Sequence, residues 1–303
     1  MTKGYICIII YMLAQPAFVA AQEGHNLDSL ASEGRRTVRE IIEELAPGYN
    51  ADSVRAEVEK GSYFSLYKDN YFIGGTEIGN GLNRLKAASS SIKFQVSISQ
   101  RLTRSRLPLD TYLYIQFTQK TIWNVLEESL PIYDMNFNPG IGLGHLIVHR
   151  NKYIGNAYVM LEHESNGKDG EYSRSWNKVS FGCRLLLSRH VDVHAKTWIP
   201  IIDSDNNRDI LRYNGLADIT LNYTSPNRRF IFTLASTWRS RSFSFNTQWE
   251  LSFKTNRNVN QYFFIQYYNG YGECLLDYNR YRNMLRIGFV IKPEGFNLFH
   301  AQP

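Results

Sequence analysis

Residues 92–99 read IKFQVSIS, and apolar and polar side chains alternate at every position in this stretch. The same period of two runs through residues 218–223 (DITLNY) and 243–253 (FSFNTQWELSF). Because successive side chains of a β-strand point to opposite faces, each segment would have one apolar and one polar face. Segments of this kind run about 9–12 residues, the length that a tilted strand needs to cross a bilayer.

Alternating segments recur about twelve times from Tyr63 onward, and turns rich in Asn, Asp and Gly, such as residues 203–207, follow several of them. The expected strand centres lie near Phe72, Val96, Ile115, Leu143, Val159, Phe181, Val193, Ile219, Thr233, Gln248, Ile265 and Phe289. An even number of strands is typical of single-chain bacterial barrels. The sequence therefore predicts an all-β fold, a transmembrane antiparallel up-and-down β-barrel of about 12 strands in the bacterial outer membrane.

A soluble β-sandwich or a lipocalin-like barrel is the alternative fold. Either one would turn its large aromatic side chains inward, including Phe243, Phe245 and Phe253. Alternation alone does not say which face is inside. An export signal, the strand count and the strand length favour the membrane barrel.

The N-terminus has the features of that export signal. Lys3 precedes a short apolar run over residues 5–14, and residues 19–21 (VAA) supply small side chains before a cleavage site. The run is too short for a convincing spanning helix, which makes a retained anchor the less favoured alternative. We therefore expect a signal peptide over residues 1–21, with cleavage before Gln22.

Residues 22–61 differ from the segments that follow. Val38, Ile41, Ile42 and Leu45 have helical spacing, so this region is expected to be an N-terminal periplasmic leader with a short helix. The barrel would then occupy residues 62–299.

The composition limits the possible functions. Aromatic residues make up 14% of the 303 residues, and the net charge of +6 is spread along the chain. A dispersed charge does not indicate a nucleic-acid partner. Outside the signal, Cys183 and Cys274 are too few for a disulfide framework, although one bridge between them remains open.

The residues that carry chemistry lie in two short motifs, residues 163–167 (HESNG) and 173–177 (SRSWN). In the period of two, His163 and Ser165 share a face with Val159 and Leu161. On the returning strand, Asn177 shares a face with residues 179, 181, 183 and 185 (Val, Phe, Cys, Leu). If these apolar rows face lipid, the three polar side chains lie together on the outer wall near one membrane interface.

Such a trio can hydrolyse an ester. Residues i and i+2 share a strand face, so His163 can take the proton of Ser165 as the hydroxyl attacks a carbonyl. Asn177 can orient the ring, and a neutral amide avoids the desolvation cost of a carboxylate facing lipid. A His-x-Ser pair is also common on ordinary surfaces, so the placement on the apolar face is what favours catalysis.

These motifs resemble the bacterial outer-membrane phospholipase A family. Supporting matches are residues 64–67 (FSLY), 93–95 (KFQ), 118–120 (TQK), 127–129 (EES), 270–273 (GYGE) and 275–279 (LLDYN), so the resemblance covers roughly residues 62–292. It implies a Ser-His-Asn triad on the lipid-facing exterior of a twelve-stranded barrel, with Ser165 as nucleophile, His163 as base and Asn177 as orienting residue. The backbone amides of Ser165 and Gly167 would stabilise the oxyanion.

The resemblance also implies a Ca²⁺ cofactor at the interface of a homodimer. Ser173 and Lys168 would contribute from one subunit and Ser129 from the other, and such hard oxygen ligands suit calcium. Gln119 matches a polar residue of the substrate and dimer region. The family usually has Arg where Lys168 stands. If the contact is a backbone carbonyl, Lys serves equally, whereas a role of the Arg guanidinium would not carry over to Lys168.

The sequence thus predicts a calcium-dependent outer-membrane phospholipase A that hydrolyses sn-1 and sn-2 acyl esters of phospholipids and lysophospholipids and is activated by dimerisation. The alternative is a non-enzymatic outer-membrane barrel, either porin-like or structural. A porin would have no reason to hold His163, Ser165 and Asn177 together on its lipid-facing wall.

Overall fold

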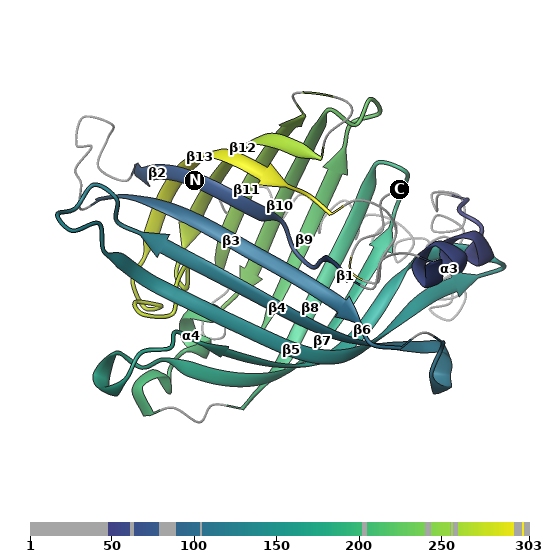
Figure 1. The fold of residues 1–303 in the computed structure, drawn as a ribbon, viewed down its shortest axis with the longest axis horizontal. Coiled ribbons are helices and arrows are strands. Elements are labelled where there is room, and N and C mark those ends of the chain that lie inside the picture. The colour runs from purple at the N-terminus through teal and green to yellow at the C-terminus, as the bar shows by residue number, and fades with distance from the viewer. Residues whose placement is uncertain are drawn as a thin grey trace, which may run out of the picture. The chain divides into compact units, whose positions relative to one another are not determined.

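The computed structural model describes residues 48–60, 64–78, 89–103, 105–201, 205–239, 244–254, 256, 260–293 and 299. Nearly all of this chain is antiparallel sheet (Figure 1). The strands are β1 (Phe64–Leu66), β2 (Asn70–Glu77), β3 (Ser90–Arg101), β4 (Thr111–Trp123), β5 (Ile132–His149), β6 (Lys152–Ser165), β7 (Ser175–Leu186), β8 (Val191–Ile201), β9 (Ala217–Thr224), β10 (Phe230–Trp238), β11 (Phe245–Lys254), β12 (Gln261–Gly270) and β13 (Arg282–Ile291).

The sheet closes on itself. Neighbouring strands pair in sequence order from β4 to β13, β13 pairs with β2, and β3 joins β2 to β4. The short β1 also pairs with β3, beyond the end of β2, so β1 and β2 together make one strand position of the barrel. The closed barrel therefore has twelve strand positions, and each of the twelve expected centres lies in a strand, which confirms the predicted fold.

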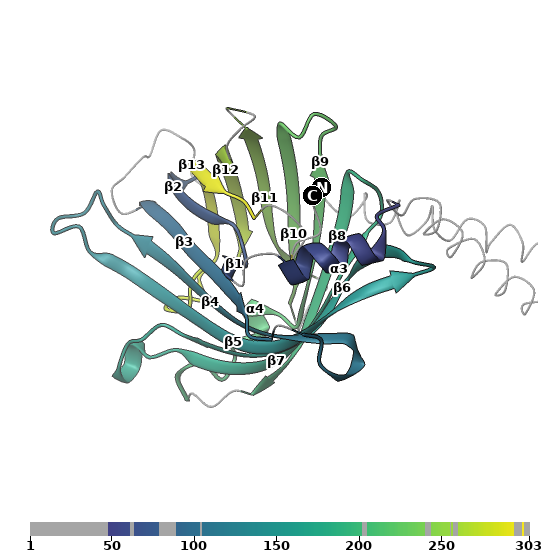
Figure 2. The same ribbon diagram turned by 45° about the vertical axis from the view of Figure 1, so that its right-hand side comes forward.

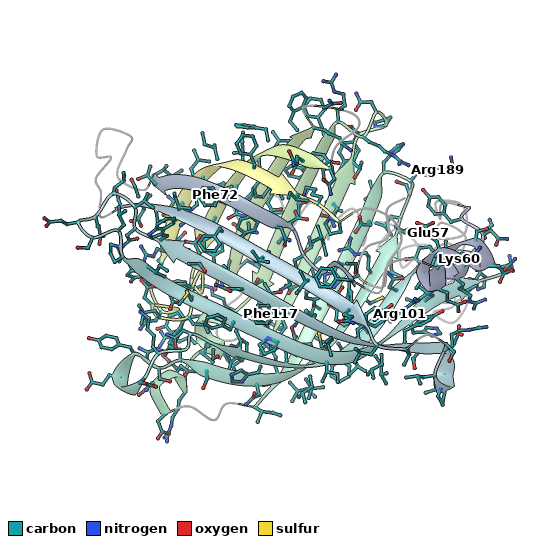
Figure 3. The ribbon with its side chains drawn as sticks, in the orientation of Figure 1. Glu57, Lys60, Phe72, Arg101, Phe117 and Arg189 are labelled. Atoms are coloured by element: carbon teal, nitrogen blue, oxygen red, sulfur yellow. The ribbon has the colours of Figure 1, made fainter. Side chains whose placement is uncertain are left out.

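The two faces of the wall differ in polarity. Most large side chains on the outer face are apolar and exposed, among them Phe72 and Phe117, both labelled in Figure 3. The expected membrane orientation is visible on β11, where Trp249 and Leu251 are exposed while Glu250 and Ser252 are buried inside. Phe253 shares the outer face of that strand. This overturns the soluble alternative, which needs Phe253 to point inward; Phe243 lies outside the described residues.

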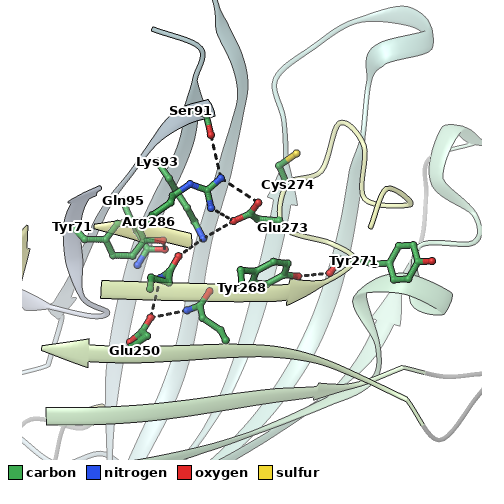
Figure 4. Close-up of polar contacts among 12 residues, drawn as sticks. Tyr71, Ser91, Lys93, Gln95, Glu250, Tyr268, Tyr271, Glu273, Cys274 and Arg286 are labelled. Atoms are coloured by element: carbon green, nitrogen blue, oxygen red, sulfur yellow. Dashed lines mark hydrogen bonds and ion pairs between the residues drawn. The ribbon is translucent and has the colours of Figure 1, made fainter. Parts of the chain in front are cut away.

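The lumen is lined by polar side chains, many of which pair with one another, around a cavity of about 860 Å³. Arg286 of β13 donates to both carboxylate oxygens of Glu273, at 2.5 Å and 3.3 Å, and Lys93 of β3 donates to Glu273 and to Gln266 (Figure 4). Lys93, Gln266, Glu273 and Arg286 are all nearly inaccessible to solvent, and we call them the lumen ion cluster. Because buried charges must be paired, these contacts hold three strands and the β12–β13 connection together.

Helix α3 (Ala51–Lys60) lies beside β6 (Figure 2). Asn50 caps its first turn by accepting from the amides of Asp52 and Ser53, and Arg101 donates to the carbonyls of Val58 and Glu59 at its last turn. We did not expect this helix at these residues. The signal peptide and the helix expected around Val38–Leu45 lie outside the described residues.

The other helical segments are short. They are η3 (Pro108–Asp110), η4 (Gly170–Tyr172), η5 (Asp205–Asn207) and α4 (Leu211–Asn214). Among the residues that the structure describes, no helix is long and apolar enough to cross a membrane. Near the C-terminus the ring of Phe299 packs edge-on against Tyr67, Tyr114 and Tyr158, with centroids 4.7 to 5.5 Å apart.

Candidate active site

The candidate site lies at the end of the β6–β7 hairpin. In its antiparallel register His163 is opposite Asn177, Ser165 is opposite Ser175, and Leu161 is opposite Val179. The alternation of β6 puts His163 and Ser165 on the outer face, because Glu162 between the outward Leu161 and His163 is buried in the lumen. The fold therefore brings His163, Ser165 and Asn177 to one spot on the outer wall.

His163 and Asn177 are joined by a hydrogen bond of 2.8 Å between the ring Nδ1 and the amide oxygen Oδ1. An amide oxygen only accepts, so this bond requires the proton of a neutral imidazole to be on Nδ1. The other ring nitrogen, Nε2, is then unprotonated and able to act as a base. The interaction fixes the tautomer that proton abstraction from a hydroxyl needs.

Ser165 does not share a hydrogen bond with His163 among the described residues. Ser165 is half-buried at the end of β6, two positions from His163 on the same face. Catalytic hydrogen bonds are often long before substrate binds, and a rotation about the serine Cα–Cβ bond suffices to change the direction of the hydroxyl. The structure thus places the three side chains together and orders one of the two bonds that a triad uses.

Exposed apolar side chains surround the trio. Leu161 precedes it on β6, Phe181 follows it on β7, and Ile199 and Ile201 lie on the neighbouring β8. Ile201 is directly opposite Asn177 in the β7–β8 register. A substrate that reaches this site therefore approaches over an apolar surface.

Asn166 organises the turn after Ser165, a role that the sequence analysis missed. Its side chain is 2% exposed, and its Oδ1 accepts from the amides of Arg174 (2.9 Å) and Lys168 (3.4 Å) while its Nδ2 donates to the carbonyl of Tyr172. The backbone amides of Ser165 and Gly167, the expected oxyanion donors, are on either side of it. A turn fixed by four side-chain and backbone bonds keeps these amides in place before substrate arrives.

Gly167 has a structural reason to be glycine. Its φ is +64°, in the left-handed region, and a Cβ there would lie 3.2 Å from the ring of Phe137. A larger residue would strain the turn and push against β5. The Gly of the 163–167 motif therefore allows the backbone to turn back close to the nucleophile.

Asn207 holds the opposite edge of the site. This fully buried side chain accepts from the amide of Ser175 (3.2 Å) and donates to its carbonyl (3.0 Å), and Ser175 is the register partner of Ser165. The sequence spacing could not identify Asn207 as a site residue, because η5 is separated from β7 by the whole of β8. The sequence shows only an Asn in a turn, which is a weak indication of such a role.

The residues expected to hold calcium lie in two neighbouring connections. Ser129 is exposed in the β4–β5 connection, and Lys168 and Ser173 lie in the β6–β7 connection. Lys168 donates its ammonium to the carbonyl of Tyr133 (3.0 Å), so the amine is engaged with the protein. The donors left for a cation are serine hydroxyls and a backbone carbonyl, and hard oxygens of this kind fit calcium.

A cavity of about 520 Å³ lies between these two connections. Its lining includes Asn124, Glu127, Tyr133, Lys168, Asp169 and Tyr172. The described residues contain no group of three or more His, Cys, Asp or Glu that could hold a metal. Two carboxylates, those of Glu127 and Asp169, are in the lining of this cavity.

Gln119 belongs to the outer face near the nucleophile. It is opposite Phe137 in the β4–β5 register, and Phe137 is opposite Ser165 in the β5–β6 register. Two strand spacings of ~4.8 Å separate Gln119 from Ser165 along this rung. The amide of Gln119 contacts Thr121 Oγ1 at 3.4 Å and Met135 Sδ at 4.0 Å. It is thus a polar group at the level of the site on the outer wall.

The two cysteines outside the signal are free. Cys183 is half-buried on β7, and the thiol of Cys274 donates to Asp277 in the β12–β13 connection. Burial is the main cause that raises the pKa of the Cys274 thiol well above its ordinary value. Neither cysteine forms the bridge that the sequence left open.

Known proteins are similar to this chain in sequence and in fold. Residues 55–291 match the family model described as Phospholipase A1. The chain is 28% identical to the Phospholipase A1 of Escherichia coli K12 over 210 residues, which cover 68% of this chain and 71% of the relative. It is 26% identical to the Phospholipase A1 of Klebsiella pneumoniae over 211 residues, with the same coverage of both chains.

Solved structures match along nearly their full length. The outer membrane phospholipase dimer of Salmonella typhi with bound calcium superposes with a TM-score of 0.67 at 23% identity, covering 81% of this chain and 98% of that one. The outer membrane phospholipase A of Escherichia coli gives the same TM-score and identity, covering 76% and 98%. These similarities establish the same barrel fold.

Proposed function

This chain belongs to the phospholipase A1 family, and on that premise we propose that it hydrolyses sn-1 and sn-2 acyl esters of phospholipids and lysophospholipids with Ser165, His163 and Asn177. It is a phospholipase of the bacterial outer membrane, and its apolar outer wall suits that location. The observation that carries the proposal is the 2.8 Å bond between His163 and Asn177, on the same outward face as Ser165. The family assignment sets aside the non-enzymatic barrel.

The reaction begins when Ser165 Oγ attacks the ester carbonyl and His163 Nε2 takes the hydroxyl proton. Asn177 holds the ring and its tautomer through Nδ1. The carbonyl electrons move to oxygen, and the amides of Ser165 and Gly167 stabilise the negative charge. The oxyanion then collapses, His163 returns the proton to the departing lysophospholipid alcohol, and an acyl-serine remains.

Water then hydrolyses the acyl-serine, with water as the nucleophile and Ser165 as the leaving group. His163 takes a proton from water, the hydroxide attacks the acyl carbonyl, and Ser165 leaves with the proton as free fatty acid forms. The apolar wall around Leu161, Phe181 and Ile199 accommodates acyl chains that diffuse laterally in the leaflet. A water-soluble ester would gain nothing from this location.

We further propose that calcium and a second copy of the chain complete the site. The Ser173 hydroxyl and Lys168 carbonyl of one subunit and the Ser129 hydroxyl of the other would hold the ion. When bound, it would add positive charge near the developing oxyanion. Gln119, on the same rung as Ser165, would lie within the subunit contact or against the acyl chain. Dimerisation would then activate the enzyme.

The test is fatty-acid release from phospholipid micelles by the purified, folded barrel with calcium. Wild-type protein should turn over, a chelator should abolish release, and Ser165→Ala should lower kcat by about 10³-fold or more, since the nucleophile is gone. Heat-modifiable migration of the folded barrel serves as the control for Ser165→Ala. Release that persists in folded Ser165→Ala would contradict the nucleophile assignment, and release that persists in chelator would contradict the calcium proposal.

A further inference from the structure

Glu164 lies between His163 and Ser165 in the chain, and its side chain points the opposite way, into the lumen. Its Oε2 accepts from the indole Nε1 of Trp176 and from the ammonium of Lys178, each at 3.1 Å. Trp176 and Lys178 are the two residues that flank Asn177. We call Glu164, Trp176 and Lys178 the lumen clamp.

The clamp lies on the other face of the same two strand ends: it takes one residue from β6 and two from β7, whereas the proposed triad takes two from β6 and one from β7. Glu164 is the register partner of Trp176, while Lys178 is diagonal to it, two register pairs further along β7 and opposite Glu162. On the outer face, His163 is the partner of Asn177 in the same stretch. Each clamp residue is therefore bonded directly to the backbone of a proposed triad residue.

Packing behind the clamp makes it rigid. Trp176 is 1% exposed and meets Trp198 edge-on with centroids 6.4 Å apart. The Lys178 ammonium lies 4.4 Å from the ring centre of Trp176 and 5.5 Å from that of Trp198. Trp198 in turn donates to the carbonyl of Gly215 after α4. The clamp therefore packs against β8, which is bonded in turn to the residue that follows α4.

We propose that Glu164 is a positioning residue, which holds the ends of β6 and β7 in the register that the His163–Asn177 bond and the direction of Ser165 require. The inference rests on the proposed function. Fixing a strand side chain on one face fixes the backbone torsions that aim its neighbours on the other face. Because β6 ends at Ser165, no further ladder pairs follow the triad residues along this strand, and the lumen-side bonds of Glu164 add to the pairing with β5 and β7 that holds the strand end.

A purely structural role would predict something different. The Arg184–Asp192 pair (2.7 Å) also joins a lumen cation of β7 to a carboxylate, but at the far end of the strand. If lumen ion pairs matter only for barrel stability, removing either one should have the same consequence. If Glu164 positions the triad, only its removal should affect the chemical step.

The test compares Glu164→Ala and Glu164→Gln with the control Asp192→Asn in folded, calcium-loaded protein. Glu164→Ala should lower kcat by about 10- to 100-fold with KM little changed, because misplacement of reacting groups by about 1 Å has that effect. Glu164→Gln should lose less, since its amide oxygen still accepts from Trp176. Asp192→Asn should keep the wild-type kcat. Exchange of the pair, Glu164→Lys with Lys178→Glu, should recover much of the rate.

A second readout separates nucleophile activation from substrate binding. An alkyl sulfonyl fluoride forms an S–O bond to Ser165 Oγ with loss of fluoride and a proton, and its rate reports how well His163 activates the hydroxyl. Glu164→Ala should slow this labelling by the same factor as kcat.

If wild type is active and folded Glu164→Ala keeps the wild-type kcat and labelling rate, the positioning role of Glu164 is wrong while the proposed function stands. Equal losses in Asp192→Asn would also overturn it. A folded wild type that releases no fatty acid would overturn the proposed function and the clamp with it.

Discussion

The barrel wall carries two polar clusters, one on each face, and they are built in opposite ways. In the lumen ion cluster, Glu273 is 5% exposed and receives both Lys93 and Arg286, so its charge is satisfied within the protein. On the outer face, His163 and Asn177 share one bond, and Ser165 has no side-chain hydrogen-bond partner among the described residues. The first cluster is closed, and the second leaves capacity for a substrate.

The difference follows from what each face can tolerate. An unpaired charge in a confined lumen costs several kcal/mol, so selection for stability favours complete pairing there. A lipid-facing wall excludes full charges even more strongly, and the proposed triad there consists of groups that can all be neutral. Neutral groups with unused hydrogen-bonding capacity are suited to chemistry. We therefore expect mutations in the closed cluster to change stability and mutations in the open one to change activity.

The largest effect should come from His163→Ala. It removes the proposed base from the open cluster, so the loss of kcat should reach about 10⁴-fold. The midpoint of unfolding should stay near that of wild type, because the side chain is half-buried with one neutral partner. Fatty-acid release and unfolding in denaturant, measured on the same preparation, check both parts. A large fall in stability would break the contrast between the two faces.

Arg286→Gln should have the next largest effect, and on stability rather than on activity. Removing one partner of a buried ion pair costs about 3–5 kcal/mol, and the lower end applies here because Lys93 still contacts Glu273. The matched control is Arg208→Gln, whose pair with Asp205 is exposed on both sides and should change stability by about 0–1 kcal/mol. Equal effects of the two substitutions on denaturant unfolding would contradict the closed-cluster description.

The alternation of apolar and polar residues in the sequence predicted the strands of the barrel and the face on which each side chain lies. It located all twelve strands, and it put His163 and Ser165 on one face, because alternation and register depend only on neighbours along the strand. It could not find Asn207, whose partner Ser175 is on a strand far away in the sequence. Nor could it identify Glu164 as more than a spacer, since its partners become visible only when β7 is placed beside β6.

The lumen cluster was beyond sequence reasoning for the same physical reason. Lys93 and Glu273 are separated by most of the chain, and closure of the barrel brings them together. Helix α3 was missed because the helical spacing that the sequence analysis used ends at Leu45, whereas Asn50 caps the start of α3. Alternation predicts the face of a residue but not which residue it meets across the lumen.

Lowering the pH should produce the smallest of these effects, a loss of stability that comes from the lumen ion cluster and not from the outer-face trio. Burial by itself raises the pKa of Glu273, but Arg286 and Lys93 outweigh it and hold the pKa at about 2, below the usual carboxyl value. A carboxyl whose pKa is lowered in the folded state stabilises it fully above the unfolded pKa, near 4.5, and that contribution fades as the pH falls toward 2. Lowering the pH from 6 to 3 should therefore remove roughly 1–2 kcal/mol through this one group.

Denaturant unfolding of wild type and Glu273→Gln at several pH values isolates the contribution of Glu273 to the free energy of unfolding, because the other carboxyls titrate in both proteins. The variant should be less stable at pH 6, and the gap should narrow by pH 3. If the difference in unfolding free energy between the two proteins stays constant from pH 6 to pH 3, Glu273 is not held ionised by Lys93 and Arg286. The charge of Glu273 would then not be satisfied within the protein, and the contrast with the outer face would fail.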